Sequence, residues 1–300
     1  MRSSKCPEPT FTGVTFTSSR RGRRKRTARP VMILAFVLLL LVAVIQIYPL
    51  IWLVFFSLKD NIDIYAGNIM GLPTRWHFEN YQQILLKSQL LRYFLNSVLV
   101  SALTILISTA GALMVSFALT RLRWRLKGFF SAFFLLGMMI PVHAALLPVF
   151  LTLQKLHLLN TLWALVIPYS GFALPFAILV LSGFMRGIPK EMEESAFIDG
   201  AGVFYCFRKI IVPLMKPAVA TVTLFTFLSS WNELMFAVTF INKSELKTLT
   251  VGIMSLVGQH STDWGALGAG LVLATLPTVL LYLLLSQQME RSLIAGAVKG

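Results

Sequence analysis

The sequence predicts an all-α protein that crosses a membrane six times. Of the 300 residues, 56% are hydrophobic and only 13% are charged, whereas about a quarter of the residues of a soluble domain are charged. Six mainly apolar stretches are each longer than the ~20 residues that cross a bilayer as a helix. The Lys and Arg residues are concentrated in alternate connecting segments, and this asymmetry predicts an orientation.

The expected spans are at about residues 31–58, 94–120, 128–154, 158–184, 217–241 and 265–288. Five of these stretches lack Asp, Glu, Lys and Arg, and the fifth in chain order contains one carboxylate, Glu233. A cleaved signal peptide is the alternative interpretation of the first stretch, because basic residues precede it. That stretch is too long for the apolar region of a signal peptide, and no small-residue cleavage site follows it, so an uncleaved span is expected.

The basic residues predict that both termini lie in the cytosol. In that orientation the cytosolic segments hold 20 of the 27 Lys and Arg residues, and the outer segments hold seven. Residues 1–30, rich in Ser, Thr and Arg, are expected to form a basic, disordered cytosolic tail. Residues 31–300 are expected to form one six-helix membrane domain.

The net charge of +15 does not by itself indicate a nucleic-acid partner. Seven Lys and Arg residues are concentrated at positions 20–29, directly before an apolar stretch, which is typical of a membrane-topology signal. The four histidines and two cysteines show no metal-ligand spacing, and no stretch matches a phosphate-binding loop. We therefore expect no catalytic residue, metal site or cofactor in this chain, and a lipid bilayer as its surroundings.

A polar segment at residues 186–216 separates the fourth and fifth expected spans, on the cytosolic side. Its acidic residues are expected to be exposed in the first turns of a short helix, where the helix dipole favours carboxylates. These residues are Glu191, Glu193 and Glu194. Gly200 and Gly202 follow and permit a sharp reversal of the chain.

A second short helix is expected at residues 203–211. Phe204, Phe207 and Ile211 share one of its faces by their spacing, and Pro213 and Pro217 are expected to end it and to start the fifth span. The polar segment therefore predicts a rigid hairpin with exposed acids and an aromatic ridge, which is a shape suited to a socket on a partner protein.

This segment resembles the Glu-Ala-Ala loop of inner-membrane permeases of binding-protein-dependent ABC importers. Glu194-Ser195-Ala196 matches Glu-Ala-Ala with one small-for-small change, and Asp199-Gly200-Ala201 and Ile211-Val212-Pro213 match the rest of the pattern. In that family the loop docks into a cleft on a cytosolic ATPase and transmits its motion. The resemblance implies an ATPase-coupling loop that includes Glu193, Glu194, Ser195, Ala196, Asp199, Gly200, Ala201, Phe204 and Pro213.

The resemblance covers nearly all of residues 31–300 and extends to the carbohydrate-uptake branch of the family. WNELMFAVTFIN (231–242) and TLTVGI (248–253) resemble that branch, and the closing SLIAGAVKG (292–300) resembles its maltose-transporter type. It implies a cell-membrane permease domain that forms half of the passage for a sugar or oligosaccharide by alternating access. The implied partners are a second permease subunit, a cytosolic ATPase dimer that hydrolyses ATP, and an extracytoplasmic solute-binding protein. The chain itself is not expected to be an enzyme.

Four residues are candidates for the substrate path. A carboxylate inside a span is costly and usually faces the interior of the helix bundle, so Glu233 is a candidate with its neighbours Trp231 and Asn232. Trp231 would stack on a sugar ring, and the other two would bond to hydroxyl groups. His143, between two intramembrane prolines, is the fourth. The alternative, that these side chains only connect helices, stays open.

Other functions also stay open at this point. The chain could import another solute, such as a polyamine or glycerol-phosphate. A secondary transporter would use Glu233 as a proton site, but it would not need the polar segment and usually shows two similar halves, which the sequence lacks. A non-transporting membrane scaffold would not need prolines within its spans.

Overall fold

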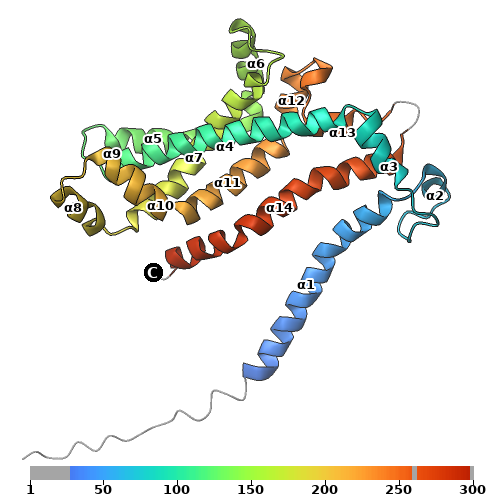
Figure 1. Ribbon diagram of the computed structural model, residues 1–300, viewed down its shortest axis with the longest axis horizontal. Helices are drawn as coiled ribbons and strands as arrows, with labels where there is room; N and C mark the ends of the chain where they lie inside the picture. The colour runs from blue at the N-terminus through green and yellow to red at the C-terminus, as the bar shows by residue number, and fades with distance from the viewer. Residues whose placement is uncertain (1–27, 259–261, 298–300) are drawn as a thin grey trace, which may run out of the picture. The chain divides into compact units, whose positions relative to one another are not determined.

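The computed structural model describes residues 28–258 and 262–297, and this part of the chain consists of helices and loops without a strand (Figure 1). The chain divides into two compact units, residues 1–51 and 52–300, and each is described by itself. The described residues of the first unit all belong to helix α1 (Ala28–Phe56), which continues into the second unit.

The second unit is built from long and short helices. Its α-helices are α2 (Asn61–Tyr65), α3 (Glu79–Gln82), α4 (Leu90–Thr120), α5 (Lys127–Gly137), α6 (Leu146–Lys155), α7 (Trp163–Arg186), α8 (Glu191–Ile198), α9 (Val203–Tyr205), α10 (Val212–Leu214), α11 (Lys216–Trp231), α12 (Met235–Phe240), α13 (Leu249–Met254) and α14 (Trp264–Ala297). Its π-helices are η1 (Gln83–Lys87) and η3 (Cys206–Ile211), and its 3-10 helices are η2 (Val142–Ala145) and η4 (Ser244–Leu246).

Four helices are long and apolar enough to cross a membrane. They are Met32–Phe56, Leu90–Thr120, Trp163–Arg186 and Trp264–Met289. Two bent pairs also qualify if each pair counts as one span: Lys127–Gly137 with Val142–Lys155, bent by 93°, and Val203–Leu214 with Lys216–Trp231, bent by 72°. The described residues therefore hold four to six candidate spans. The first, second, fourth and sixth predicted spans coincide with the four long helices.

The predicted span at 128–154 is not one continuous helix. α5 ends at Gly137, and the chain resumes at Val142 in a helical segment bent by 93° from α5. Pro141 lies in the break with an extended backbone, at φ −65° and ψ 118°. Proline lacks the amide that an α-helix needs and disfavours helical backbone in the residue before it, which explains why the helix stops here.

The predicted span at 217–241 is also interrupted. α11 ends at Trp231, and a separate helix, α12, follows. The carboxylate of Glu233 lies in the gap. It accepts hydrogen bonds from the backbone amides of Phe236, at 2.9 and 3.1 Å, and Ala237, at 3.2 Å. Because the first amides of a helix have no partner within it, this carboxylate stabilises the start of α12.

α4 and α7 lie side by side and run in the same direction (Figure 1). Near the starts of the two helices, Val100 lies in one apolar cluster with Ala164 and Leu165. Near their ends, the hydroxyl of Ser116 donates to the carbonyl of Ile178 at 3.3 Å. The segments that follow the two helices therefore lie at the same end of the second unit.

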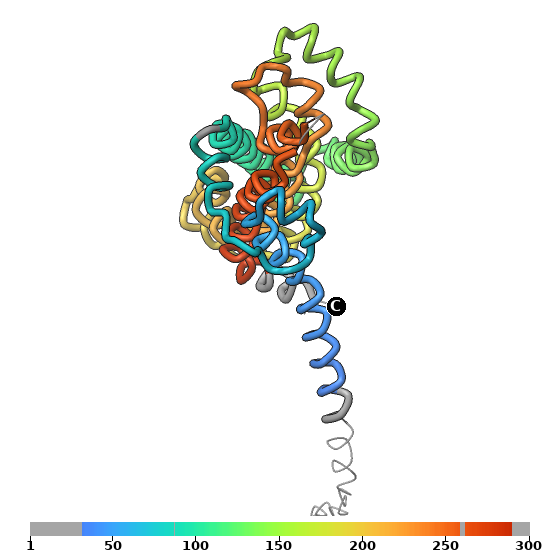
Figure 2. Tube along the Cα trace, turned by 90° about the vertical axis from the view of Figure 1, so that its right-hand side faces the viewer, coloured from blue at the N-terminus to red at the C-terminus, as the bar shows by residue number. Residues whose placement is uncertain are grey.

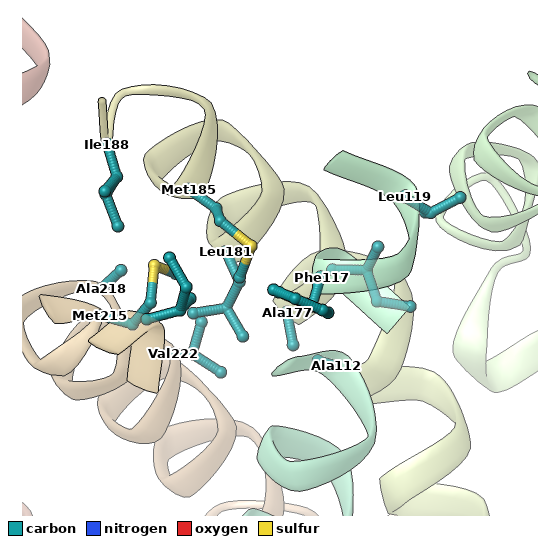
Figure 3. Close-up of a cluster of buried hydrophobic side chains, with 12 residues drawn as sticks. Ala112, Phe117, Leu119, Ala177, Leu181, Met185, Ile188, Met215, Ala218 and Val222 are labelled. Atoms are coloured by element: carbon teal, nitrogen blue, oxygen red, sulfur yellow. The ribbon is translucent and has the colours of Figure 1, made fainter. Parts of the chain in front are cut away.

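A cluster of buried apolar side chains joins this end of α4 and α7 to α11 (Figure 3). It consists of Ala112, Phe117, Leu119, Ala177, Ile178, Leu181, Met185, Ile188, Ile211, Met215, Ala218 and Val222. Ala112, Ala177 and Ala218 are fully buried, and small side chains of this kind let membrane helices approach closely. In lipid this contact is stabilised by packing of atoms rather than by removal of apolar surface from water.

The connecting segments at the opposite end also contact one another, and α6 and α12 pack together beside one of these contacts (Figures 1 and 2). The side chain of Asn160 accepts a hydrogen bond from the backbone amide of Lys243 at 3.1 Å. The side chain of Gln83 donates to the carboxylate of Asp263 at 3.2 Å. The predicted outer segments are thus gathered at one end, and the polar segment 186–216 lies at the other.

Candidate functional site

A helical hairpin, built from α8, α9, η3 and α10, connects α7 to α11. α8 ends in a turn where Gly200 has a φ of +84°. The amide of Ala201 donates to the carbonyl of Ala196 at 2.9 Å, which satisfies the helix end as in other glycine C-caps. A Cβ at Gly200 would have no described atom within 4 Å, so backbone conformation and not space favours glycine. Gly202 has an ordinary φ of −78°, and the reversal therefore needs one glycine rather than two.

The second arm of the hairpin continues past Pro213, so this proline alone does not end it, and the arm stops between Pro213 and Pro217, the two prolines expected to end it. Pro213 lies in the first turn of α10, where its missing amide costs little. The π-helix η3 precedes it and changes the backbone pairing before the proline is reached. The arm ends at Leu214 instead, and the chain bends by 72° into α11.

Glu193 lies in the base of the hairpin, by which we mean the side that contacts α4 and α7. It is 5% exposed, and its Oε1 lies 2.7 Å from Nε of Arg121, the residue that follows α4. Burial raises the pKa of the Glu193 carboxyl, although the charges of Arg121 and Lys190 act in the opposite direction. The prediction of an exposed acid at this position is wrong, because the fold brings a distant arginine to it.

Phe207 anchors the second arm of the hairpin to α4. Its ring centroid lies 5.1 Å from that of Phe117 in α4, and Ile211 is fully buried in the neighbouring cluster. Phe204, by contrast, is 72% exposed. The predicted aromatic ridge is therefore divided between the base and the exposed surface.

The tip of the hairpin, residues 194–205, is largely exposed. Ile198 is 86% exposed and is the most exposed of its apolar side chains. The carboxylates of Glu194 and Asp199 are also exposed. Apolar side chains gathered on a surface together with polar ones are typical of a protein-interaction site.

A second candidate site is a cavity of about 280 Å³ between α4, α7 and α11. Its polar lining residues are Thr104, Tyr169, Thr226, Ser229, Ser230 and Glu233, and its apolar lining residues are Val142, Phe172, Ala173, Phe176 and Phe225. Aromatic rings combined with a few placed polar groups are typical of pockets that bind small molecules.

Tyr169 fixes the Glu233 carboxylate at this cavity. The tyrosine hydroxyl donates to Oε2 of Glu233 at 2.5 Å. The backbone carbonyl of Glu233 accepts a further bond from the hydroxyl of Thr250 at 3.0 Å. The tyrosine hydroxyl and the amides at the start of α12 hold the carboxylate in one orientation, so it both lines the cavity and stabilises a helix.

Residues 108–295 match the family model described as "Binding-protein-dependent transport system inner membrane component". The chain belongs to this family. It is a multi-pass inner-membrane permease subunit of an ABC transport system, and the resemblance identified from the sequence is confirmed. The matched residues include the hairpin and all the lining residues of the cavity except Thr104.

Relatives of this permease are similar over most of their length. The "Probable ABC transporter permease protein YurM" of Bacillus subtilis (strain 168) is 36% identical over 278 residues, which are 93% of this chain and 91% of that protein. The "Diacetylchitobiose uptake system permease protein NgcG" of Streptomyces coelicolor is 34% identical over 266 residues, 87% of each protein. A solved chain from "a bacterial ABC transporter involved in the import of the acidic polysaccharide alginate" has a TM-score of 0.77 at 24% identity. It covers 88% of this permease and 98% of that chain, so the two share a fold.

Trp231 packs inside the permease and is not among the residues that line the cavity. It is 3% exposed, its indole donates to the carbonyl of Ala274 at 3.0 Å, and its ring stacks on Phe227 at 5.1 Å. Asn232 is exposed, and its side chain donates to the carbonyl of Leu228 at 2.9 Å. These contacts favour packing and helix-ending roles.

His143 is exposed in η2, and its neighbour Val142 lines the cavity instead. Of the four candidates for the substrate path, only Glu233 therefore lies in the lining of this cavity.

The sequence analysis missed the cavity residues of α7. Tyr169, Phe172 and Phe176 lie at i, i+3 and i+7, a spacing that places them on one helix face. That signal becomes meaningful only when α7 is known to lie beside the segment that carries Glu233. Arg121 was missed for a similar reason, because it was counted only as one of the basic residues that predict orientation.

Proposed function

We propose that this permease forms half of the passage of an ATP-driven importer for a sugar or oligosaccharide, and that it works by alternating access. The observation that carries the proposal is the hairpin, whose base is anchored by Glu193 and Phe207 and whose tip exposes apolar side chains. A hairpin anchored in this way can transmit the displacement of a partner protein to the membrane helices, whereas a flexible loop would bend.

The names of the relatives and the lining of the cavity support a carbohydrate as the solute. NgcG is named for diacetylchitobiose uptake, and the alginate importer for a polysaccharide. The cavity offers phenylalanine rings for the apolar faces of a sugar and hydroxyl groups for its polar edges. In this proposal Glu233 contacts the solute directly, while Trp231, Asn232 and His143 support the helices of the path.

The hairpin tip docks into a cleft of a cytosolic ATPase dimer, which hydrolyses the ATP. The docking surface consists of Glu194, Ser195, Ala196, Asp199, Ala201 and Phe204. Gly200 provides the turn, and Glu193 and Pro213 position the two arms. A second permease subunit completes the passage, and an extracytoplasmic solute-binding protein delivers the sugar.

Six spans cross the membrane in this proposal: α1, α4, the bent pair of α5 and α6, α7, α11 with α12, and α14. Both termini and the hairpin lie in the cytosol. The contact between the segments 59–92 and 243–263 at one end of the second unit supports this alternation, as does the contact between Arg121 and the hairpin at the other end. Residues 31–300 form the permease domain. The expected tail at 1–30 lies almost entirely outside the described residues.

Cysteine labelling in intact cells tests this topology, after Cys6 and Cys206 have been replaced by Ser. A cysteine at Arg123 or Gly200 should be protected from a membrane-impermeant maleimide, and a cysteine at the exposed Trp76 should react. Labelling of position 200 from outside would contradict both the topology and the role of the hairpin.

Purification from native membranes in mild detergent tests the importer itself. An ATPase and a second permease should co-purify with the chain, and the reconstituted complex should take up diacetylchitobiose only when ATP is supplied. Uptake that needs no ATPase and follows a proton gradient would show a secondary transporter instead.

A further inference from the structure

We infer that Arg121 and Glu193 form the joint through which movement of the hairpin reaches α4 and α7. They act as a positioning pair for the coupling proposed above, and the inference rests on that proposed function. No residue of the pair needs to touch the ATPase or the solute.

Arg121 holds three segments of the chain together. Its Nε lies 2.7 Å from Oε1 of Glu193 in α8. Its Nη2 donates to the carbonyl of Met185 at 3.0 Å, in the last turn of α7, and to the carbonyl of Ile188 at 2.8 Å. Arg121 itself follows the last residue of α4. One guanidinium therefore fixes the end of α4, the end of α7 and the first arm of the hairpin in one arrangement.

The geometry requires a guanidinium at position 121. Its donors point in several fixed directions within one plane, so it can serve a carboxylate and two carbonyls at once. Lysine would keep the positive charge at the end of a flexible stem, but it lacks the planar fork that faces Glu193 with Nε while Nη2 donates to two carbonyls. The side chains of Arg121 and Glu193 are only 5% and 7% exposed, so water does not readily replace the lost contacts.

Stability alone does not account for this pair. Taking two charges out of water costs free energy that their attraction often fails to return. The raised pKa of Glu193 indicates that burial outweighs the attraction of Arg121 at this site. The pair therefore serves to connect α8 to the end of α4 rather than to add a large gain in folding free energy.

The two arms of the hairpin are attached in different ways. The second arm meets α4 through Phe207 and Phe117, an apolar contact that keeps much of its energy when the rings slide. The first arm is held by Glu193 through a buried ion pair with Arg121, whose attraction weakens when the two charges move apart. Hydrogen bonds to the carbonyls of Met185 and Ile188 keep the guanidinium itself in place. The first arm is therefore the one that passes a displacement to a fixed point at the ends of α4 and α7.

α4 and α7 extend from this joint to the cavity. α4 contributes Thr104 to the lining, and α7 contributes Tyr169, Phe172 and Phe176. The two helices pack against each other along both ends, through two separate apolar clusters. A displacement of their hairpin ends is therefore carried to the cavity walls, because packed helices move as units.

The test compares Arg121→Lys and Glu193→Gln in the complex that co-purifies with the chain, with Cys6 and Cys206 replaced by Ser. Ser229→Cys supplies a reporter, because this residue is exposed and lines the cavity. The measurement is the change in its maleimide labelling rate between the nucleotide-free complex and the complex trapped with ATP and vanadate. ATPase retention and ATP hydrolysis are measured on the same samples.

We expect both variants to retain the ATPase and to hydrolyse ATP. The ATP-dependent change in labelling should fall about fivefold or more, which is in the usual range of coupling between two sites. Glu191→Gln and Arg123→Lys are matched controls, because they make the same chemical changes at exposed neighbours, and they should behave as the parent complex. If Arg121→Lys reduces the amount of complex, Glu193→Gln, which hardly changes the shape of the side chain, decides the test alone.

The inference would be overturned if the ATP-dependent change in labelling rate were the same in Glu193→Gln as in the parent complex. In that case Glu194→Lys shows what has failed. If Glu194→Lys sheds the ATPase, the proposed function stands and only the joint is wrong. If Glu194→Lys also leaves docking and hydrolysis unchanged, the coupling role of the whole hairpin is wrong.

Discussion

Glu193 and Glu194 are adjacent in the chain but belong to different surfaces of the hairpin. Glu193 is buried in the base beside Arg121, and Glu194 is exposed at the tip. One step along an α-helix turns the side chain by about 100°, so two consecutive acids can face α4 and a separate protein. The acid that matches the family motif and the acid that holds the hairpin in place are therefore different residues.

The largest expected effect would follow from a change at the tip. Glu194→Lys should prevent docking of the ATPase, because removing a charge from a desolvated interfacial pair costs about 2–5 kcal/mol of binding free energy and the new cation adds repulsion. A pull-down of the ATPase from solubilised membranes measures it. Glu191→Lys makes the same change at an exposed position at the start of α8 and should retain the ATPase. If both variants retained the ATPase equally, the proposed difference in role between the base and the tip would be wrong.

A change in the turn should have the next largest effect. Gly200→Val places a β-branched residue at a φ of +84°, which costs about 1–3 kcal/mol of backbone strain and misplaces the tip. ATP hydrolysis stimulated by the loaded binding protein should fall, while the complex still assembles in the membrane. Gly202→Val is the control, because its extended backbone accepts valine and no described atom lies near the added Cβ. A normal response from Gly200→Val would show that the turn does not shape the docking surface.

A third carboxylate, that of Glu233, extends the comparison, because it is held by neutral hydrogen-bond donors and not by a cation. Glu233→Gln keeps the shape of the side chain but loses charge-assisted hydrogen bonds, each worth about 1.5–3 kcal/mol. In the sugar-uptake assay proposed above, uptake per complex should fall more than the amount of complex. Tyr169→Phe removes only one of these bonds, worth about 1.5–3 kcal/mol, and should have a smaller effect because the backbone amides still hold the carboxylate. If Glu233→Gln lowers abundance while uptake per complex stays constant, the carboxylate serves only to start α12.

The smallest expected effect concerns the base and pH. Burial raises the pKa of Glu193 above the ordinary value of 4.5, and the charges of Arg121, Lys190 and Glu194 act on the same group. The folded state then keeps a proton that the unfolded chain would release. The contribution of Glu193 to stability is therefore fully present when the pH is below the ordinary pKa of the group. It is lost as the pH rises through the raised pKa of the folded state.

Thermal unfolding of the solubilised complex measures this difference. The melting temperature of the parent protein should rise relative to that of Glu193→Gln as the pH is lowered from about 7 to about 5. Glu191→Gln, which removes an exposed carboxyl from the same helix, is the control. A difference that grows in the opposite direction would mean that Arg121 stabilises the charged form more than burial destabilises it.

The sequence could predict features that depend on neighbouring residues. The long helices α4, α7 and α14 follow from apolar stretches, and the turn at Gly200 follows from the only residue type that adopts its φ at low cost. The resemblance to the family also depends on short motifs within the hairpin. The two interrupted spans show the limit, because composition predicts how many apolar residues lie in a row and not whether their helix continues.

Pro141 and Glu233 show why the sequence alone does not predict where these two spans are interrupted. A proline in an apolar stretch can kink a helix or end it, and packing decides between the two. A carboxylate in such a stretch can face a solute or receive backbone amides, and here it receives the amides of α12 while also lining a cavity. Both outcomes depend on which other helices lie nearby.

The sequence by itself determined that this protein is helical, lies in a membrane, and carries a glycine-hinged polar hairpin between two of its spans. The reason is that bilayer thickness, backbone conformation and hydrophobic pattern act over short stretches of chain. Only the tertiary structure decided that Glu193 faces Arg121, that Trp231 packs inward, and that Tyr169 meets Glu233. Each of these contacts joins residues that lie far apart in the sequence or depends on which helix packs alongside, and burial and hydrogen-bond partners arise only when the helices pack against one another.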